Sequence, residues 1–149
     1  MKKITIIGAG NMGGAIARGL IKGNLIPAEN ITISDISENL LNKFREISSV
    51  WSLTTSNKEA VKDADVIILA VKPWLIENIT TEITNFINPE KQIIVSIVAG
   101  IDFKQLTTFL GKEFTLFRVI PNTAIEVKES VSTIASLNAD EEQIQLVKS

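Results

Sequence analysis

The chain of 149 residues contains no cysteine and no histidine. The absence of cysteine excludes disulfides and thiolate chemistry, and the absence of histidine removes the commonest metal ligand and general acid–base catalyst. Aromatic residues make up only 5% of the chain, the net charge is −2, and no block of like charge suggests a nucleic-acid or anionic-membrane partner. No segment has the length and apolarity of a membrane span, and no secretory signal is visible, so we expect a cytoplasmic location.

An apolar run near the start of the chain ends in a glycine-rich segment, Gly8-Ala9-Gly10-Asn11-Met12-Gly13, which passes into a helical pattern. Strand, glycine turn and helix in this order are typical of the loop that binds the pyrophosphate of a dinucleotide. Gly8 would allow the tight turn, Gly10 would let the backbone approach the phosphates, and Gly13 would let the helix pack closely on the strand. The first free N–H groups of the helix would then face the anion.

A glycine-rich motif alone often marks only a turn without a binding role, so the context of this segment matters. That context supports the interpretation. A strand precedes the segment, and Met12, Ile16 and Leu20 lie on one face of the helix that follows. A second strand, residues 31–34, ends at Asp35. That position is about 20 residues beyond the last glycine, where a carboxylate that binds the adenosine ribose is expected.

Strand and helix patterns alternate along the whole chain. We predict strands at residues 3–8, 31–34, 50–53, 66–71, 92–97, 114–119 and 131–135, with helices between and after them. The continuous apolar run at 66–71 is typical of a strand buried on both faces. The alternation predicts one α/β dinucleotide-binding domain over residues 1–149. Its sheet is doubly wound and mostly parallel, of the Rossmann type, and binds ligands at the carboxyl ends of the strands.

Segments at these strand ends occur in an order that resembles the pyrroline-5-carboxylate reductase family over essentially the whole chain. Besides the glycine loop they are residues 57–59, 70–73, 96–101 and 118–123. The sequences AVKP and RVIPNT among them are not general features of dinucleotide folds. The resemblance implies reduction of the cyclic imine of pyrroline-5-carboxylate to L-proline, with hydride from NADPH or NADH.

The resemblance also implies where the cofactor binds. The glycine loop would hold the pyrophosphate, the end of the second strand and residue 57 would border the adenosine ribose, and the later strand ends would lie beside the nicotinamide. We assign no catalytic residue and no metal ligand in this chain. The residues expected at the cofactor are Gly8, Ala9, Gly10, Asn11, Met12, Gly13, Ser34, Asp35, Asn57, Ala70, Val71, Lys72, Pro73, Ala99, Gly100, Pro121 and Asn122.

The chain departs from the family in two respects. Thr123 is followed by Ala124, where the family usually has proline, which would alter a turn. The family also continues into a helical domain that forms the dimer and supplies most of the imino-acid site, whereas this sequence ends at Ser149. We therefore expect the cofactor-binding half of a homo-oligomeric enzyme, with weak cofactor binding and negligible turnover on its own.

Several side chains have two interpretations. Asp35 favours NADH, because a carboxylate accepts hydrogen bonds from ribose hydroxyls and repels the 2′-phosphate of NADPH. The family leans towards NADPH, so the choice between the two cofactors stays open. Lys72 could donate a proton or bind a carboxylate, but we favour a solvated lysine. The amide of Asn122 could equally bond the nicotinamide carboxamide or the neighbouring loop. Trp51 and Trp74 are predicted to be packing residues.

Two other functions fit the same pattern. The chain could come from another Rossmann-type reductase or dehydrogenase, although the ordered AVKP and PNT segments argue against it. It could also be a stand-alone module that senses NAD(H) and catalyses nothing. A glycine- and serine-rich continuation of the encoded reading frame would favour the enzyme, and a natural stop codon after Ser149 would favour the sensor.

Overall fold

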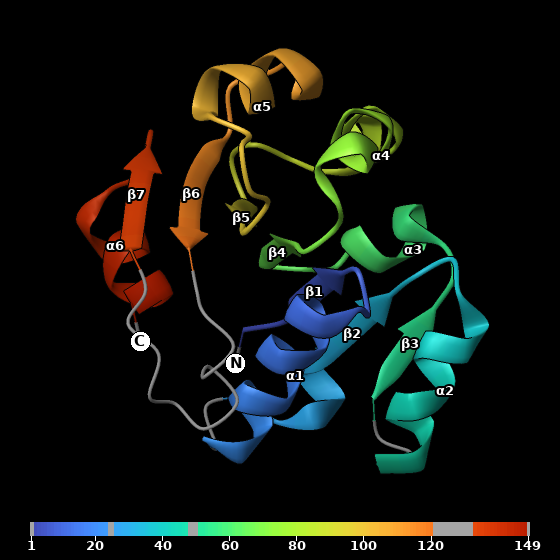
Figure 1. Ribbon diagram of the computed structural model, residues 1–149. Coiled ribbons are helices and arrows are strands. Elements are labelled where there is room, and N and C mark those ends of the chain that lie inside the picture. Colours follow the sequence, from blue (N-terminus) through green and yellow to red (C-terminus); the bar gives the residue numbers. More distant parts are fainter. Residues whose placement is uncertain (1, 24–25, 48–50, 121–132, 149) are drawn as a thin grey trace.

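One mixed sheet forms the centre of the computed structural model, which describes residues 2–23, 26–47, 51–120 and 133–148 (Figure 1). Its strands are β1 (Ile4–Ile7), β2 (Ile31–Ser34), β3 (Ser52–Thr54), β4 (Val66–Leu69), β5 (Ile93–Ser96), β6 (Thr115–Ile120) and β7 (Thr133–Leu137). The strand order is β3-β2-β1-β4-β5-β6-β7. All neighbours are parallel except β6 and β7, which are antiparallel. The predicted doubly wound, mostly parallel sheet of the Rossmann type is confirmed.

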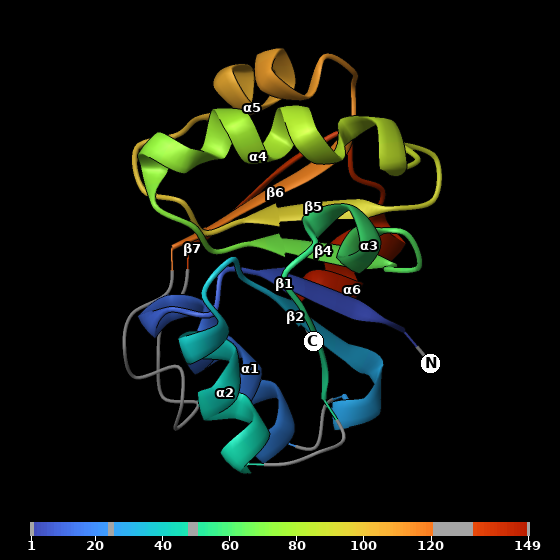
Figure 2. The same ribbon diagram turned by 90° about the vertical axis from the view of Figure 1, so that its right-hand side faces the viewer.

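Helices cover both faces of this sheet (Figure 2). The α-helices are α1 (Asn11–Lys22), α2 (Glu38–Ile47), α3 (Asn57–Val61), α4 (Ile76–Ile83), α5 (Phe103–Leu110) and α6 (Glu141–Lys148). The short 3₁₀ helices are η1 (Ala28–Asn30), η2 (Pro73–Leu75) and η3 (Thr84–Phe86). Helices α1, α2 and α6 pack on one face, and α3, α4 and α5 pack on the other. Within the described residues, none of the helices combines the length and the apolarity needed to cross a membrane.

The position of strand β4 in the sheet explains the continuous apolar run in its sequence. All four of its residues are buried, because its alternate side chains enter two different cores. Val66 and Ile68 belong to the core beneath α1 and α2, whereas Ile67 and Leu69 belong to the core beneath α4 and α5. The prediction of a strand buried on both faces is therefore confirmed.

The order of the strands places a crevice beside β1. From β1 the chain moves outward through β2 to β3, and it then returns to the other side of β1 to form β4. The loops that follow β1 and β4 therefore lead to helices on opposite faces of the sheet. A ligand crevice in an open α/β sheet lies at such a switch point, outside the carboxyl ends of the strands.

The structure corrects three details of the sequence prediction. Strand β3 begins at Ser52 and β7 extends to Leu137, and the predicted starts of these strands at residues 50 and 131 lie outside the described residues. The spacing of Leu40, Phe44 and Ile47 predicts that they share one apolar face of α2. Phe44 is buried together with Leu41, whereas Leu40 is half-buried. Leu40 is less covered because it lies beyond the end of the sheet, where it lines a pocket.

Candidate functional site

A pocket of about 470 Å³ lies at the carboxyl edge of the sheet, on the loops that follow β1, β2, β4 and β5. This is the edge at which the sequence predicted the ligand, and the pocket brings together residues that are far apart in the chain. Among the described residues, those that line it are Gly8, Gly10, Asn11, Met12, Asp35, Leu40, Ala70, Val71, Lys72, Leu75 and Ile97.

The glycine loop between β1 and α1 forms one wall of the pocket. Gly8 has a φ of +110°, and an added Cβ would lie 2.4 Å from the carbonyl oxygen of Ala70. A Cβ on Gly13 would lie 1.9 Å from the carbonyl oxygen of Gly8. The tight turn at Gly8 and the close packing at Gly13 are therefore confirmed. At Gly10, by contrast, an added Cβ would meet no described atom within 4 Å, so this position is open toward the pocket.

The first turn of α1 supplies hydrogen-bond donors to the same wall. Gly10 is the N-cap residue and has no side chain to satisfy the first N–H groups, and no acidic residue lies in the first turn. These N–H groups have no partner within an α-helix, and the helix dipole adds positive potential at this end. Since Asn11 and Met12 line the pocket, this wall has the chemistry of an anion-binding site.

Asp35 directly follows β2, lines the pocket and contacts the glycine loop. Its Oδ2 accepts a hydrogen bond from the backbone N–H of Ala9, and its Oδ1 accepts one from the backbone N–H of Ser37, both at 2.8 Å. The N–H of Asp35 itself donates to the carbonyl oxygen of Thr54 at 3.2 Å. The half-buried carboxylate is thus held between the glycine loop and the turn that leads into α2.

Ser34 and Asn57, also predicted at the cofactor, lie behind Asp35. Both are buried, and the hydroxyl of Ser34 donates to Oδ1 of Asn57 at 2.6 Å. Neither is among the residues that line the pocket. Their bond joins the end of β2 to the start of α3, so a contact between either side chain and a ribose stays a prediction.

The segment after β4 forms the opposite wall. Ala70, Val71 and Lys72 line the pocket as predicted, and Pro73 begins η2. Trp74, in the middle of η2, is 74% exposed, so the prediction that it is a packing residue is wrong. The single 3₁₀ turn directs its neighbour Leu75 to the pocket instead.

Trp51 behaves as predicted. It is 7% exposed and packs edge-on against Phe44, with the two ring centroids 5.5 Å apart. The side chain belongs to the core beneath α1 and α2 and is not among the residues that line the pocket.

The end of β5 contributes fewer residues to the pocket than the sequence predicted. Ala99 and Gly100 are exposed and do not line the pocket, and Gly100 has a φ of +77°. Pro121 and Asn122 lie outside the described residues, so their proposed places beside the nicotinamide stay predictions.

Sequence reasoning missed three apolar lining residues: Leu40, Leu75 and Ile97. Each stands in a segment that was already predicted as a helix or a strand. An apolar residue in such a segment looks like part of the core, so the sequence carries no separate signal that it lines a pocket. Ile97 alone had a hint, because it falls within the family-like segment 96–101.

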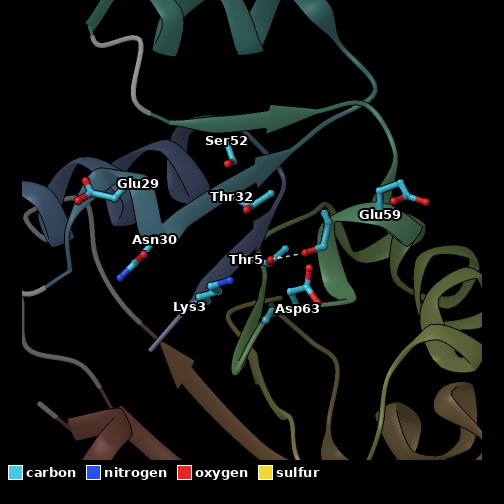
Figure 3. Close-up of a pocket in the computed structure, with 10 residues that line it drawn as sticks. Lys3, Thr5, Glu29, Asn30, Thr32, Ser52, Glu59 and Asp63 are labelled. Carbon is cyan, nitrogen blue, oxygen red and sulfur yellow. Dashed lines mark hydrogen bonds between the residues drawn. The ribbon is translucent and has the colours of Figure 1, made fainter. Parts of the chain in front are cut away.

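A second pocket, of about 180 Å³, lies toward the amino ends of β1, β2 and β3 (Figure 3). The hydroxyl-bearing side chains of Thr5, Thr32 and Ser52 are neighbours in register on these strands. The Thr5 hydroxyl donates to the carbonyl oxygen of Ala60. Because open α/β sheets bind ligands at the carboxyl ends of their strands, we place the candidate site in the first pocket.

Comparison with known proteins adds to this geometry. Residues 3–100 match the protein family described as "NADP oxidoreductase coenzyme F420-dependent". The pyrroline-5-carboxylate reductase of Methanosarcina acetivorans is 36% identical over 134 residues, which are 90% of this chain and 49% of that protein.

Solved structures of pyrroline-5-carboxylate reductases are also similar to this chain. A pyrroline-5-carboxylate reductase from Coxiella burnetii superposes with a TM-score of 0.90 at 29% identity, over 98% of this chain and 54% of that one. The pyrroline carboxylate reductase of Plasmodium falciparum with NADP bound superposes with a TM-score of 0.86 at 26% identity, over 98% of this chain and 52% of that one. The chain therefore spans about half the length of the relatives that it matches.

Proposed function

Because this chain belongs to the family of NADP oxidoreductases described as coenzyme F420-dependent, we propose that it is the cofactor-binding part of a pyrroline-5-carboxylate reductase. The complete enzyme would reduce the cyclic imine of pyrroline-5-carboxylate to L-proline in proline biosynthesis. The observation that carries the proposal is the glycine loop. It leaves open space at Gly10 and places the first turn of α1 against a pocket at the carboxyl edge of the sheet.

The residues of the pocket fit a nicotinamide dinucleotide, which would supply the hydride. The glycine loop and the first N–H groups of α1 suit a pyrophosphate. The carboxylate of Asp35 suits a ribose, and residues 70–73 would line the path to the nicotinamide. In the proposed enzyme this chain's residues bind and orient the cofactor.

The reaction requires little more than orientation from this part of the enzyme. A protonated imine is already electrophilic, so the absence of histidine from the chain does not disable it. Donors for the substrate carboxylate would come mainly from a second domain, which would also form the homo-oligomer. The imino-acid substrate, the homo-oligomeric state and the cytoplasmic location are parts of this proposal.

An assay of the encoded full-length protein tests the proposal. We expect consumption of NADH or NADPH only when pyrroline-5-carboxylate is present, with an equal amount of L-proline formed, and negligible turnover by the 149-residue chain alone. Cofactor binding by the full-length protein without any formation of proline would contradict the reductase and favour a sensing module. Turnover of the short chain at the full-length rate would contradict its assignment as a cofactor-binding part.

A further inference from the structure

The carboxylate of Asp35 keeps acceptor capacity after its two backbone hydrogen bonds. An ionised carboxylate has about four lone-pair positions on its two oxygens. The N–H of Ala9 occupies one on Oδ2, and the N–H of Ser37 occupies one on Oδ1. One position on each oxygen remains, on a residue that lines the pocket. Two adjacent acceptors match the 2′- and 3′-hydroxyls of a ribose, which are adjacent donors.

A ribose 2′-phosphate has the opposite requirement. It replaces a donor by acceptor oxygens that carry a charge of about −1.5 to −2, as in other phosphate monoesters. The backbone N–H groups of Ala9 and Ser37 would suit such an anion, but both already donate to Asp35. The phosphate would therefore meet a negative charge and no free donor among these groups.

The residues that follow Asp35 provide no positive charge to offset the repulsion between its carboxylate and a 2′-phosphate. Ile36 is apolar and 83% exposed, and Ser37 is neutral. Glu38 is acidic, and its carboxylate binds Arg45 of α2 at 3.0 Å. Among the described residues that line the pocket, Lys72 alone is a cation, and it stands on the wall that follows β4.

We infer that the ribose end of this pocket selects NADH over NADPH and that Asp35 is the residue that determines the specificity. The inference rests on the proposed function, which leaves the choice of cofactor open. The carboxylate is preorganised for this role. Turning it away from a phosphate would remove the acceptors of two backbone N–H groups, one of them in the glycine loop.

Parallel calorimetric titrations of this chain with NADH and NADPH test the inference. We expect NADH to bind at least about tenfold more tightly. ADP-ribose should likewise bind more tightly than ADP-ribose 2′-phosphate, because NADH and NADPH differ at the adenosine ribose and not at the nicotinamide. High salt should reduce the ratio of affinities, since the Debye length falls from about 10 Å at 0.1 M to about 3 Å at 1 M.

Variants of Asp35 identify the residue responsible. Asp35→Asn keeps the size of the side chain and removes its charge, so the ratio of affinities should fall toward one. Asp35→Ser combined with Ile36→Arg adds a phosphate-binding guanidinium and should invert the preference. The matched control is Asp63→Asn, an exposed acidic residue of the second pocket, which should leave the ratio unchanged.

The outcomes separate the inference from the proposed function. Equal or tighter binding of NADPH by the unaltered chain overturns the inference, while the reductase proposal stands if the full-length protein forms proline. A preference for NADH that survives in Asp35→Asn overturns the role of Asp35. Failure of the chain to bind either cofactor or ADP-ribose contradicts the inference and the assignment of this chain as the cofactor-binding part, while the full-length assay still decides the reductase. The salt series on the unaltered chain applies even if a variant does not fold.

Discussion

At Gly10, the effect of a substitution on cofactor binding can be separated from its effect on the stability of the fold. No described atom lies within 4 Å of an added Cβ, and a φ of −76° suits any amino acid. Gly10 is also the N-cap of α1, where serine is at least as favourable as glycine. We expect Gly10→Ser to keep the melting temperature unchanged or slightly higher and to weaken cofactor binding at least about tenfold. Thermal melts and calorimetric titration measure the two effects.

Gly13 is the matched comparison for that experiment. A Cβ there would lie 1.9 Å from a backbone oxygen that cannot move freely, so Gly13→Ala should destabilise the fold by about 1–3 kcal/mol. If Gly10→Ser bound the cofactor as tightly as the unaltered chain, the pyrophosphate would have to lie elsewhere.

At the scale of elements, one buried hydrogen bond joins β2 to α3. It runs from the hydroxyl of Ser34 to Oδ1 of Asn57, next to Asp35 in the chain. Ser34→Ala and Asn57→Ala should each lower the free energy of unfolding by about 1–3 kcal/mol, because each leaves a buried polar partner unsatisfied. The double variant should cost less than the sum of the two, by about 0.5–3 kcal/mol, in urea denaturation. Strict additivity would show that the bond contributes nothing.

Asn57→Asp refines this experiment. Aspartate keeps an oxygen that accepts from Ser34, but it replaces the amide NH₂ group by a second oxygen and adds a negative charge. If the folded variant binds the cofactor less tightly, position 57 lies close to the bound cofactor, as the family resemblance implies. If stability and cofactor binding both stay unchanged, Asn57 acts only by joining the two elements.

How much the sequence predicts differs between elements. The strands β4 and β5 carry strong local signals, namely apolar runs, and both are confirmed. The start of α5 is equally local, because Asp102 and Gln105 form a capping box only three residues apart. The bond between Asp35 and Ala9 links residues 26 positions apart and depends on the pairing of β1 with β2, which no local pattern encodes. Leu75 and Trp74 have similar sequence character, and only the turn of η2 decides which of them meets the pocket.

For the whole molecule, the site predicts a link between ligand and stability. A cofactor that binds only the folded chain should add about 2.7 kcal/mol at a concentration of 100 times its Kd. For a domain of this size each kcal/mol raises the melting temperature by about 2–4 °C. Thermal melts at rising NADH concentration should therefore show a shift of several degrees. Gly10→Ser should reduce the shift, because binding at least about tenfold weaker adds only about 1.4 kcal/mol or less at the same NADH concentration. An undiminished shift in that variant would mean binding away from the glycine loop.

The hydrogen bond between Asp35 and Ala9 also bears on how such a site can evolve. A lineage that exchanges this carboxylate for another side chain loses, in the same step, the present acceptor of an N–H group in the loop that we propose to receive the pyrophosphate. Under the inference above, the preference for one cofactor and the geometry of the loop would therefore change together. A change of preference also requires an acceptor for the N–H of Ala9, either from the new side chain at position 35 or from a second substitution.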